Sequence, residues 1–139
     1  PNLDVIWTAS DSMAIGAKRA IIESQRDVIV GGIDWSEQGI KYVQGGVLDA
    51  SVGGHFMNGG IALILLYDYF HGKDFKEELG LEVNFDMFEL TPKNIKRFRE
   101  DFSPNQWDKI DFRKYSKVLN PALKKYDFSL DTFINSVNK

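Results

Sequence analysis

The sequence predicts an α/β fold, a parallel sheet with flanking helices, followed by a helical carboxyl-terminal tail. Short apolar stretches rich in β-branched residues alternate with helix-like stretches, in an order that begins and ends with a strand. Polar turn residues follow each of the first strands, as expected where a helix returns over a parallel sheet. With 139 residues, of which 43% are hydrophobic, the chain is long enough for a packed core.

The first strand–helix unit comes at the start of the chain. Residues 5–8, VIWT, are typical of a strand buried on both faces. The next polar residues, Ser10, Asp11 and Ser12, are all good helix N-caps. The following helix is predicted to have one apolar face, formed by Met13, Ala17, Ala20 and Ile21.

The second unit repeats this plan. Residues 28–33, VIVGGI, predict a second buried strand, and residues 34–36 predict a turn. A short helix around Ile40 is expected to end at Gly45 and Gly46. Residues 50–54 then predict a third strand.

The middle of the chain predicts one more helix and one more strand. Residues 61–66 are apolar all round, which predicts that the helix over 59–71 is buried on most sides. This apolar run is far shorter than the ~20 residues that cross a membrane. Residues 81–90 alternate between apolar and polar side chains, which is typical of a half-exposed strand.

The tail from Thr91 onward is predicted to be mostly helical. Thr91 followed by Pro92 resembles an N-cap with proline in the first helical position. Ser129 is placed to cap a last helix with one apolar face. That face comprises Leu130, Phe133, Ile134 and Val137.

Composition and motifs exclude several classes of function. The net charge of −3 and the lack of a long basic run argue against nucleic acid as a partner. Without cysteine there is no disulfide, thiolate nucleophile or cysteine metal site, and His55 and His71 lack metal-ligand spacing. No nucleophile-elbow or phosphate-loop motif follows a strand. We therefore expect no cofactor, no metal and no enzymatic activity.

Polar residues at the ends of three predicted strands form the candidate site, because ligands bind at the carboxyl edge of an open parallel sheet. These residues are the pairs Ser10–Asp11, Asp34–Trp35 and Gly54–His55. Asp11 either caps its helix or faces the ligand. Asp34 with Trp35 suits a polyhydroxylated ring, by hydrogen bonding and stacking, unless Trp35 packs in the core. A catalytic α/β domain, or a phosphoacceptor role for Asp34, is the competing interpretation.

The sequence of residues 1–75 resembles the carboxyl-terminal half of type I periplasmic solute-binding proteins, the ribose- and galactose-binding group, and of the related lactose-repressor-like regulators. The residues concerned are SDSMAIGA after the first strand, GID at the end of the second and GVLDASV over the third. They occur in the order and at the spacing of the family.

The resemblance implies which residues bind the ligand. Members bind sugars through an Asn, an Asp and a Gln whose positions here are Ser10, Asp34 and Gly54, with Asp11 beside the first. Two amides are therefore replaced, which favours a polar, sugar-like ligand other than ordinary ribose or galactose. His55 and Trp35 are the possible substitutes. The Ser–Asp pair also resembles the autoinducer-2 receptors of the family.

The resemblance also implies architecture and role. Residues 1–58 would form part of the second lobe, 59–90 would return to the first, and 91–139 would be an extension, with the last crossing near residues 53–58. The implied function is solute binding in the periplasm for the permease of an ABC importer. A sensor that feeds a membrane histidine kinase and a repressor-type effector domain are the alternatives. Because strands without neighbours invite pairing, the chain is expected to dimerise or to require a missing amino-terminal part.

Overall fold

The computed structural model describes residues 2–101 and 109–137. The chain divides into two compact units. Within the described residues, unit 1 comprises 2–54 and 87–101, and unit 2 comprises 55–86 and 109–137. The chain passes from unit 1 to unit 2 between Gly54 and His55 and returns to unit 1 at Met87.

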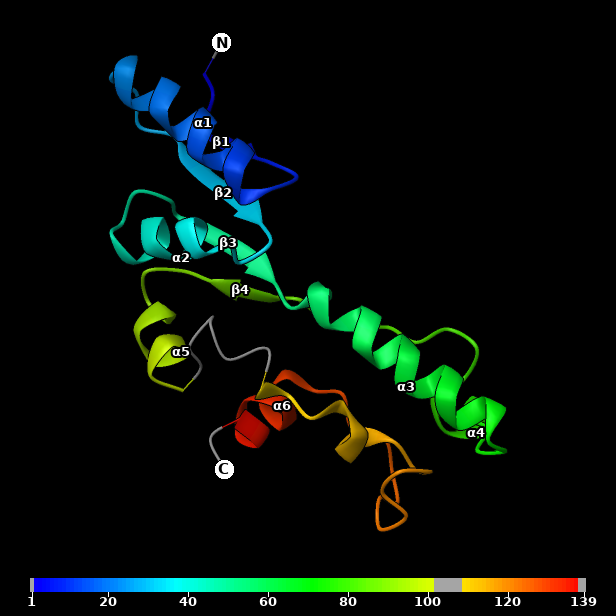
Figure 1. Cartoon of the computed structure of the whole chain (residues 1–139). Coiled ribbons are helices and arrows are strands. Elements are labelled where there is room, and N and C mark those ends of the chain that lie inside the picture. Colours follow the sequence, from blue (N-terminus) through cyan, green and yellow to red (C-terminus); the bar gives the residue numbers. More distant parts are fainter. Residues whose placement is uncertain (1, 102–108, 138–139) are drawn as a thin grey trace. The chain divides into compact units, whose positions relative to one another are not determined.

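Unit 1 contains a four-stranded sheet in the order β1-β2-β3-β4 (Figure 1). Its strands are β1 (Val5–Trp7), β2 (Ile29–Ile33), β3 (Ala50–Gly53) and β4 (Phe88–Leu90). The first three run parallel, with Trp7 opposite Gly31 and Gly31 opposite Ala50. This confirms the predicted parallel α/β sheet for three of the four strands.

The fourth strand is shorter than predicted, and it does not run parallel to its neighbour. Only Phe88–Leu90 is a strand, and it pairs antiparallel with β3. Phe88 lies opposite Gly53, the last residue of β3, so the ladder has no further β3 residue to pair with Met87 and those before it. Residues 81–86 belong to unit 2 instead.

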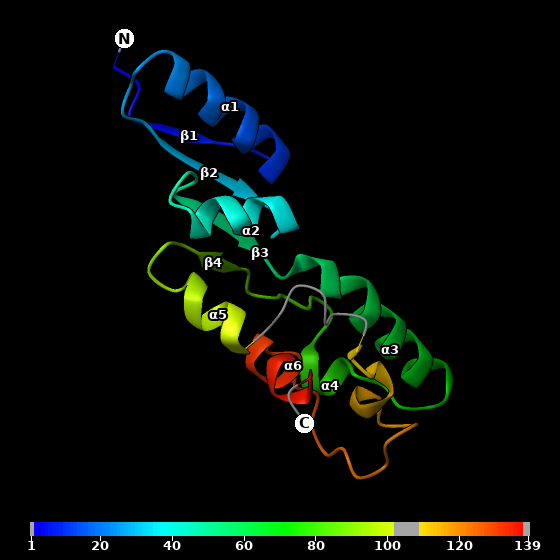
Figure 2. The ribbon, with the colours of Figure 1, turned by 60° about the vertical axis from the view of Figure 1, so that its left-hand side comes forward.

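Three helices lie among the described residues of unit 1: α1 (Asp11–Glu23), α2 (Glu37–Gln44) and α5 (Ile95–Asp101). The Ser10 side chain caps α1 by accepting from the amide of Met13 at 3.3 Å. Ser36 caps α2 in the same way, through the amide of Gly39 at 3.0 Å. Helix α2 contacts α1, α5 and β3, so the helices form one layer against the sheet (Figure 2).

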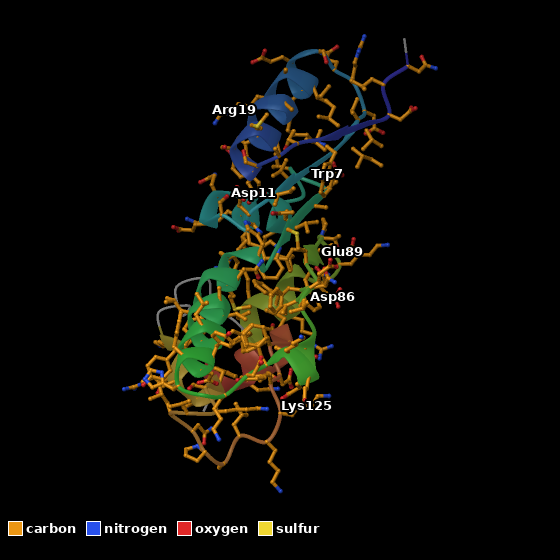
Figure 3. The ribbon with its side chains drawn as sticks, turned by 90° about the vertical axis from the view of Figure 1, so that its right-hand side faces the viewer. Trp7, Asp11, Arg19, Asp86, Glu89 and Lys125 are labelled. Carbon is orange, nitrogen blue, oxygen red and sulfur yellow. The ribbon has the colours of Figure 1, made fainter. Side chains whose placement is uncertain are left out.

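The helices cover one face of the sheet and leave the other open. On the covered face Val30, Ser51 and Leu90 are buried. On the other face Val5, Trp7 and Ile29 are 53%, 55% and 56% exposed. Figure 3 shows Trp7 on the side of the sheet away from α1. The prediction that β1 is buried on both faces is wrong for this chain, because no described element of unit 1 packs on the second face.

Unit 2 is built around α3 (Asn58–Phe70), with the shorter helices α4 (Lys76–Leu79) and α6 (Leu130–Val137). The described part of unit 2 also includes two 3₁₀ helices, His55–Met57 and Phe112–Tyr115. No helix in the described part of the chain has the length and apolar character needed to cross a bilayer.

Helix α3 buries one face only. Ile61, Ile64 and Leu65 are buried, whereas Leu63 and Phe70 are largely exposed. The expectation that this helix is buried on most sides is therefore wrong. Apolar residues on all sides of a helix do not show which of its faces packs against other segments of the chain. In the tail, Tyr115 packs on Phe133 of α6 with ring centroids 4.8 Å apart.

A buried carboxylate on α3 organises the tail. Asp68 accepts hydrogen bonds from the hydroxyls of Ser116 and Tyr126 and from the amides of Lys117, at 2.6 Å, and Val118. Burial alone would raise the pKa of the Asp68 carboxyl, but these hydrogen bonds together hold the pKa below its usual value. Because the amides of Lys117 and Val118 bind a carboxylate, this part of the tail is irregular rather than helical.

We expect unit 2 to depend on the charge of Asp68. Replacement by Asn leaves donors without an ionised acceptor, so Asp68→Asn should reduce the free energy of unfolding by about 3 kcal/mol. Because folding lowers the pKa of Asp68, its stabilisation is complete above the unfolded value and is lost as pH falls through the folded value. Urea unfolding at a series of pH values below about 5 tests this. Asp86→Asn, at an exposed aspartate of the same unit, should change neither the free energy of unfolding nor its dependence on pH.

Candidate functional site

The carboxyl edge of the parallel strands brings three of the predicted residues to one side of unit 1. Ser10, Asp34 and Gly54 follow β1, β2 and β3 respectively. Asp34 is exposed, Ser10 is half-buried and Gly54 is buried with a φ of 107°. His55 is the first residue of unit 2, where its ring packs edge-on against Phe56.

Asp34 is an exposed residue in a strained turn. Its φ is 120° and that of Trp35 is 54°, in a region that residues other than glycine rarely adopt. Such conformations cost about 1–3 kcal/mol each and persist only where surrounding contacts enforce them. Here the amide of Asp34 donates to the carbonyl of Val52 at 2.8 Å, and the amide of Trp35 donates to the Ser51 hydroxyl at 3.4 Å.

Trp35 is part of the core. Its side chain is 4% exposed, and its indole N–H donates to the carbonyl of Ser51 at 3.1 Å. The ring packs edge-on against Phe98, with centroids 4.8 Å apart. A Cβ atom at Gly53 would lie 2.4 Å from the indole, so glycine is required there. This placement disagrees with the predicted stacking role of Trp35 and agrees with the alternative that it anchors the turn.

Asp11 is fully buried at the start of α1 (Figure 3). One carboxylate oxygen accepts from the amide of Ser36 at 2.8 Å and from its hydroxyl at 2.9 Å. The other oxygen accepts from the hydroxyl of Ser51 at 2.6 Å. In this arrangement Asp11 connects α1 to the loop after β2 and to β3, and it does not face solvent.

Two glycines provide the space for this carboxylate. A Cβ atom at Gly39 would lie 2.0 Å from an Asp11 carboxylate oxygen, and one at Gly32 would lie 2.8 Å from the other. Sequence reasoning missed Ser51 and Gly39 as parts of the site. The available signal was a hydroxyl in an otherwise apolar strand, because a buried hydroxyl requires a partner.

The exposed polar groups at this edge of the sheet are hydrogen-bonding groups. Ser10 contributes a hydroxyl that also lies 2.9 Å from the hydroxyl of Ser12. Asp34 contributes an exposed carboxylate, which accepts hydrogen bonds strongly. Among the residues that the structure describes, no cluster of three metal-ligating side chains is present. The edge is therefore suited to donors such as ligand hydroxyl groups.

Two hollows lie away from this edge, each on one unit. One, of about 250 Å³, runs beside α3 and is lined by apolar residues that include Leu63 and Tyr67. The other, of about 270 Å³, lies beside Asp4 and Arg26, at the amino ends of β1 and β2. Neither is lined by Ser10 or Asp34. The candidate site therefore lies at the edge of the strands and not in either of these hollows.

Solved structures of solute-binding proteins are similar to this chain. A periplasmic sugar-binding protein from Pseudomonas fluorescens is 27% identical with a TM-score of 0.76, over 98% of this chain and 42% of that protein. An ABC transporter solute-binding protein from Bacillus halodurans with bound myo-inositol is 24% identical with a TM-score of 0.58, over 73% and 35%. An ABC transporter periplasmic solute-binding protein from Actinobacillus succinogenes with bound D-allose is 25% identical with a TM-score of 0.58, over 70% and 34%.

The fold is therefore that of the type I periplasmic solute-binding proteins, which confirms the resemblance seen in residues 1–75. The chain spans less than half the length of each of these proteins. The sequence matches no family model and no curated protein.

We predict opposite effects of the same glycine substitution in two helices. Gly16→Ala in α1 should stabilise unit 1 by about 0.5–1 kcal/mol, because alanine favours helix and its Cβ meets nothing within 4 Å. Gly39→Ala in α2 has the same helical advantage but displaces the Asp11 carboxylate, so it should destabilise by at least about 1 kcal/mol. Urea unfolding of both variants measures the difference. Equal stabilisation by both would contradict the packing described around Asp11.

Proposed function

We propose that this chain forms part of the ligand-binding region of a periplasmic solute-binding protein that delivers a small, sugar-like ligand to an ABC importer. The observation that carries the proposal is the exposed Asp34 carboxylate, held in a strained turn at the carboxyl edge of the sheet. The similarity to proteins solved with myo-inositol and D-allose supports a polyhydroxylated ligand.

The proposed contacts divide into a strong acceptor and weaker neighbours. Asp34 accepts from ligand hydroxyls, and Ser10 adds a single hydroxyl. Gly54 has no side chain to offer, and His55 is left out of the proposed contacts because it belongs to unit 2. We leave Asp11 and Trp35 out of the proposed contacts because both are buried. With fewer amide contacts than the family pattern, the site favours a ligand other than ordinary ribose or galactose.

The proposed role is binding without chemical conversion, in the periplasm. Ligand would select a closed arrangement of a two-part protein, and a membrane permease would recognise that arrangement. Two of the similar proteins are described as ABC transporter proteins, which supports import over the sensing and repressor roles.

We further propose that the open face of the unit 1 sheet packs against additional α/β segments of the same protein. The exposed side chains of Val5, Trp7 and Ile29 form an apolar surface on strands β1 and β2. Strand β1 pairs only with β2 among the described strands, so its outer edge is available for pairing. The similar protein from Pseudomonas fluorescens has more than half of its length beyond the matched region.

Asp34→Ala tests the ligand assignment. In the full-length protein, we expect at least one of myo-inositol, D-allose and D-ribose to raise the melting temperature of the wild type. Asp34→Ala should weaken that binding by about 2–3 kcal/mol, roughly 30- to 150-fold, since it removes a charged acceptor. Titration calorimetry measures the loss. Asp27→Ala, at an exposed aspartate before β2, should bind like the wild type, and undiminished binding by Asp34→Ala would overturn the assignment.

Sedimentation of the 139-residue chain tests the open face. On its own the chain should associate with rising concentration, because its apolar face and strand edge lack the segments that would cover them. Trp7→Lys should weaken this association, whereas Leu81→Lys, at an exposed residue of unit 2, should not. A stable, monodisperse monomer of the unaltered chain would contradict the proposal.

A further inference from the structure

We infer that Asp11 is a positioning residue, whose buried carboxylate sets the orientation of Asp34. The inference rests on the proposed ligand contact of Asp34. Asp11 has no exposed surface with which to touch a ligand. It acts through the two residues that follow Asp34, namely Trp35 and Ser36.

The first connection runs through Ser51. The amide of Trp35 donates to the Ser51 hydroxyl oxygen at 3.4 Å, and that hydroxyl donates to Asp11 at 2.6 Å. A hydroxyl has one proton to give and lone pairs that accept, so Ser51 can accept from Trp35 while its proton goes to another acceptor. The Asp11 carboxylate is that acceptor, and it thereby fixes the direction of the chain of hydrogen bonds.

The second connection runs through Ser36. Its amide donates to Asp11 at 2.8 Å, and its hydroxyl donates to the same oxygen at 2.9 Å. The Ser36 hydroxyl oxygen in turn accepts from the amide of Gly39 at 3.0 Å, which starts α2. The carboxylate therefore holds the end of the turn and the start of the helix together.

These two connections act on a turn that would otherwise relax. Asp34 and Trp35 both have positive φ angles, which are unfavourable for their side chains. When the amides of Trp35 and Ser36 lose their anchor, the backbone can rotate to an ordinary conformation. The Asp34 carboxylate then leaves the position from which it is proposed to bind ligand.

Asparagine is the appropriate replacement at position 11 because it preserves size. Its side chain has one oxygen, whereas the site presents donors to both carboxylate oxygens. Either orientation of the amide therefore leaves Ser36 or Ser51 facing an N–H group. The Asp11→Asn variant should loosen the turn without creating a cavity.

Asp49 offers a matched control within the same unit. Its carboxylate also connects separate elements, accepting from the amide of Val30 at 2.8 Å and from the Lys18 ammonium at 3.1 Å. It precedes β3, at the end of that strand opposite to the candidate site. Asp49→Asn should therefore cost stability in unit 1 while leaving the Asp34 turn intact.

Hydrogen exchange and ligand affinity together test the inference. In Asp11→Asn we expect the amides of Trp35 and Ser36 to exchange at least about tenfold faster by NMR than in the wild type. The Kd for the sugar that binds the wild type, among myo-inositol, D-allose and D-ribose, should rise about tenfold or more. Asp49→Asn should leave both quantities unchanged. Ser51→Ala removes only one of the two connections. It should shift the amide exchange rates and the Kd in the same direction as Asp11→Asn.

The outcomes separate this inference from the proposed function. Suppose that Asp34→Ala binds the sugar weakly, whereas Asp11→Asn exchanges its amides and binds the sugar like the wild type. That result would overturn the positioning role alone. Equal losses in Asp11→Asn and Asp49→Asn would also overturn it, by showing a general effect of stability. Normal binding by Asp34→Ala would overturn the proposed function instead. The exchange measurement needs no ligand and can be made on Ser51→Ala if Asp11→Asn does not fold, so unchanged exchange decides against the inference in every case.

Discussion

The burial of one carboxylate, that of Asp11, is the constraint on which the arrangement of unit 1 depends. A buried charge costs several kcal/mol unless hydrogen-bond donors surround it. The hydroxyls of Ser36 and Ser51 provide those donors, and both serines are therefore held at fixed positions. The absence of side chains at Gly32 and Gly39 makes the necessary space. One acidic group thus holds the start of α1, the loop after β2 and strand β3 together at the carboxyl edge of the sheet.

Unit 2 uses the same physical solution. Asp68 is buried on α3 and accepts from two hydroxyls and two backbone amides of the tail. In both units the donors are serine or tyrosine hydroxyls and amides of irregular chain. Segments that form no ladder and no helix are in this way held in place, because their amides still find acceptors. The tail from 112 to 126 is consequently ordered around α3 with little regular helix of its own.

The arrangement separates the group that faces solvent from the groups that hold it. Asp34 is exposed at the strand edge, whereas Trp35 is buried beneath it against Gly53 and Phe98. A strained turn is tolerable there because the core side chain and the buried carboxylate together enforce it. This is the geometry expected of a rigid scaffold that presents one strong acceptor at its surface, which is the role proposed for Asp34.

Local sequence patterns predicted three parallel strands, a helix start among Ser10, Asp11 and Ser12, the end of the next helix at Gly45 and Gly46, and the position of Asp34 after a strand. These follow from periodicity and capping, which neighbouring residues encode. The tertiary structure decided the antiparallel pairing of β4, the burial of Trp35, the one-sided packing of α3 and the role of Asp11. Each of these depends on partners distant in sequence, such as Ser51, which lies 40 residues after Asp11. A local pattern shows that an aspartate follows a strand, but only the three-dimensional arrangement shows whether it faces solvent or donors.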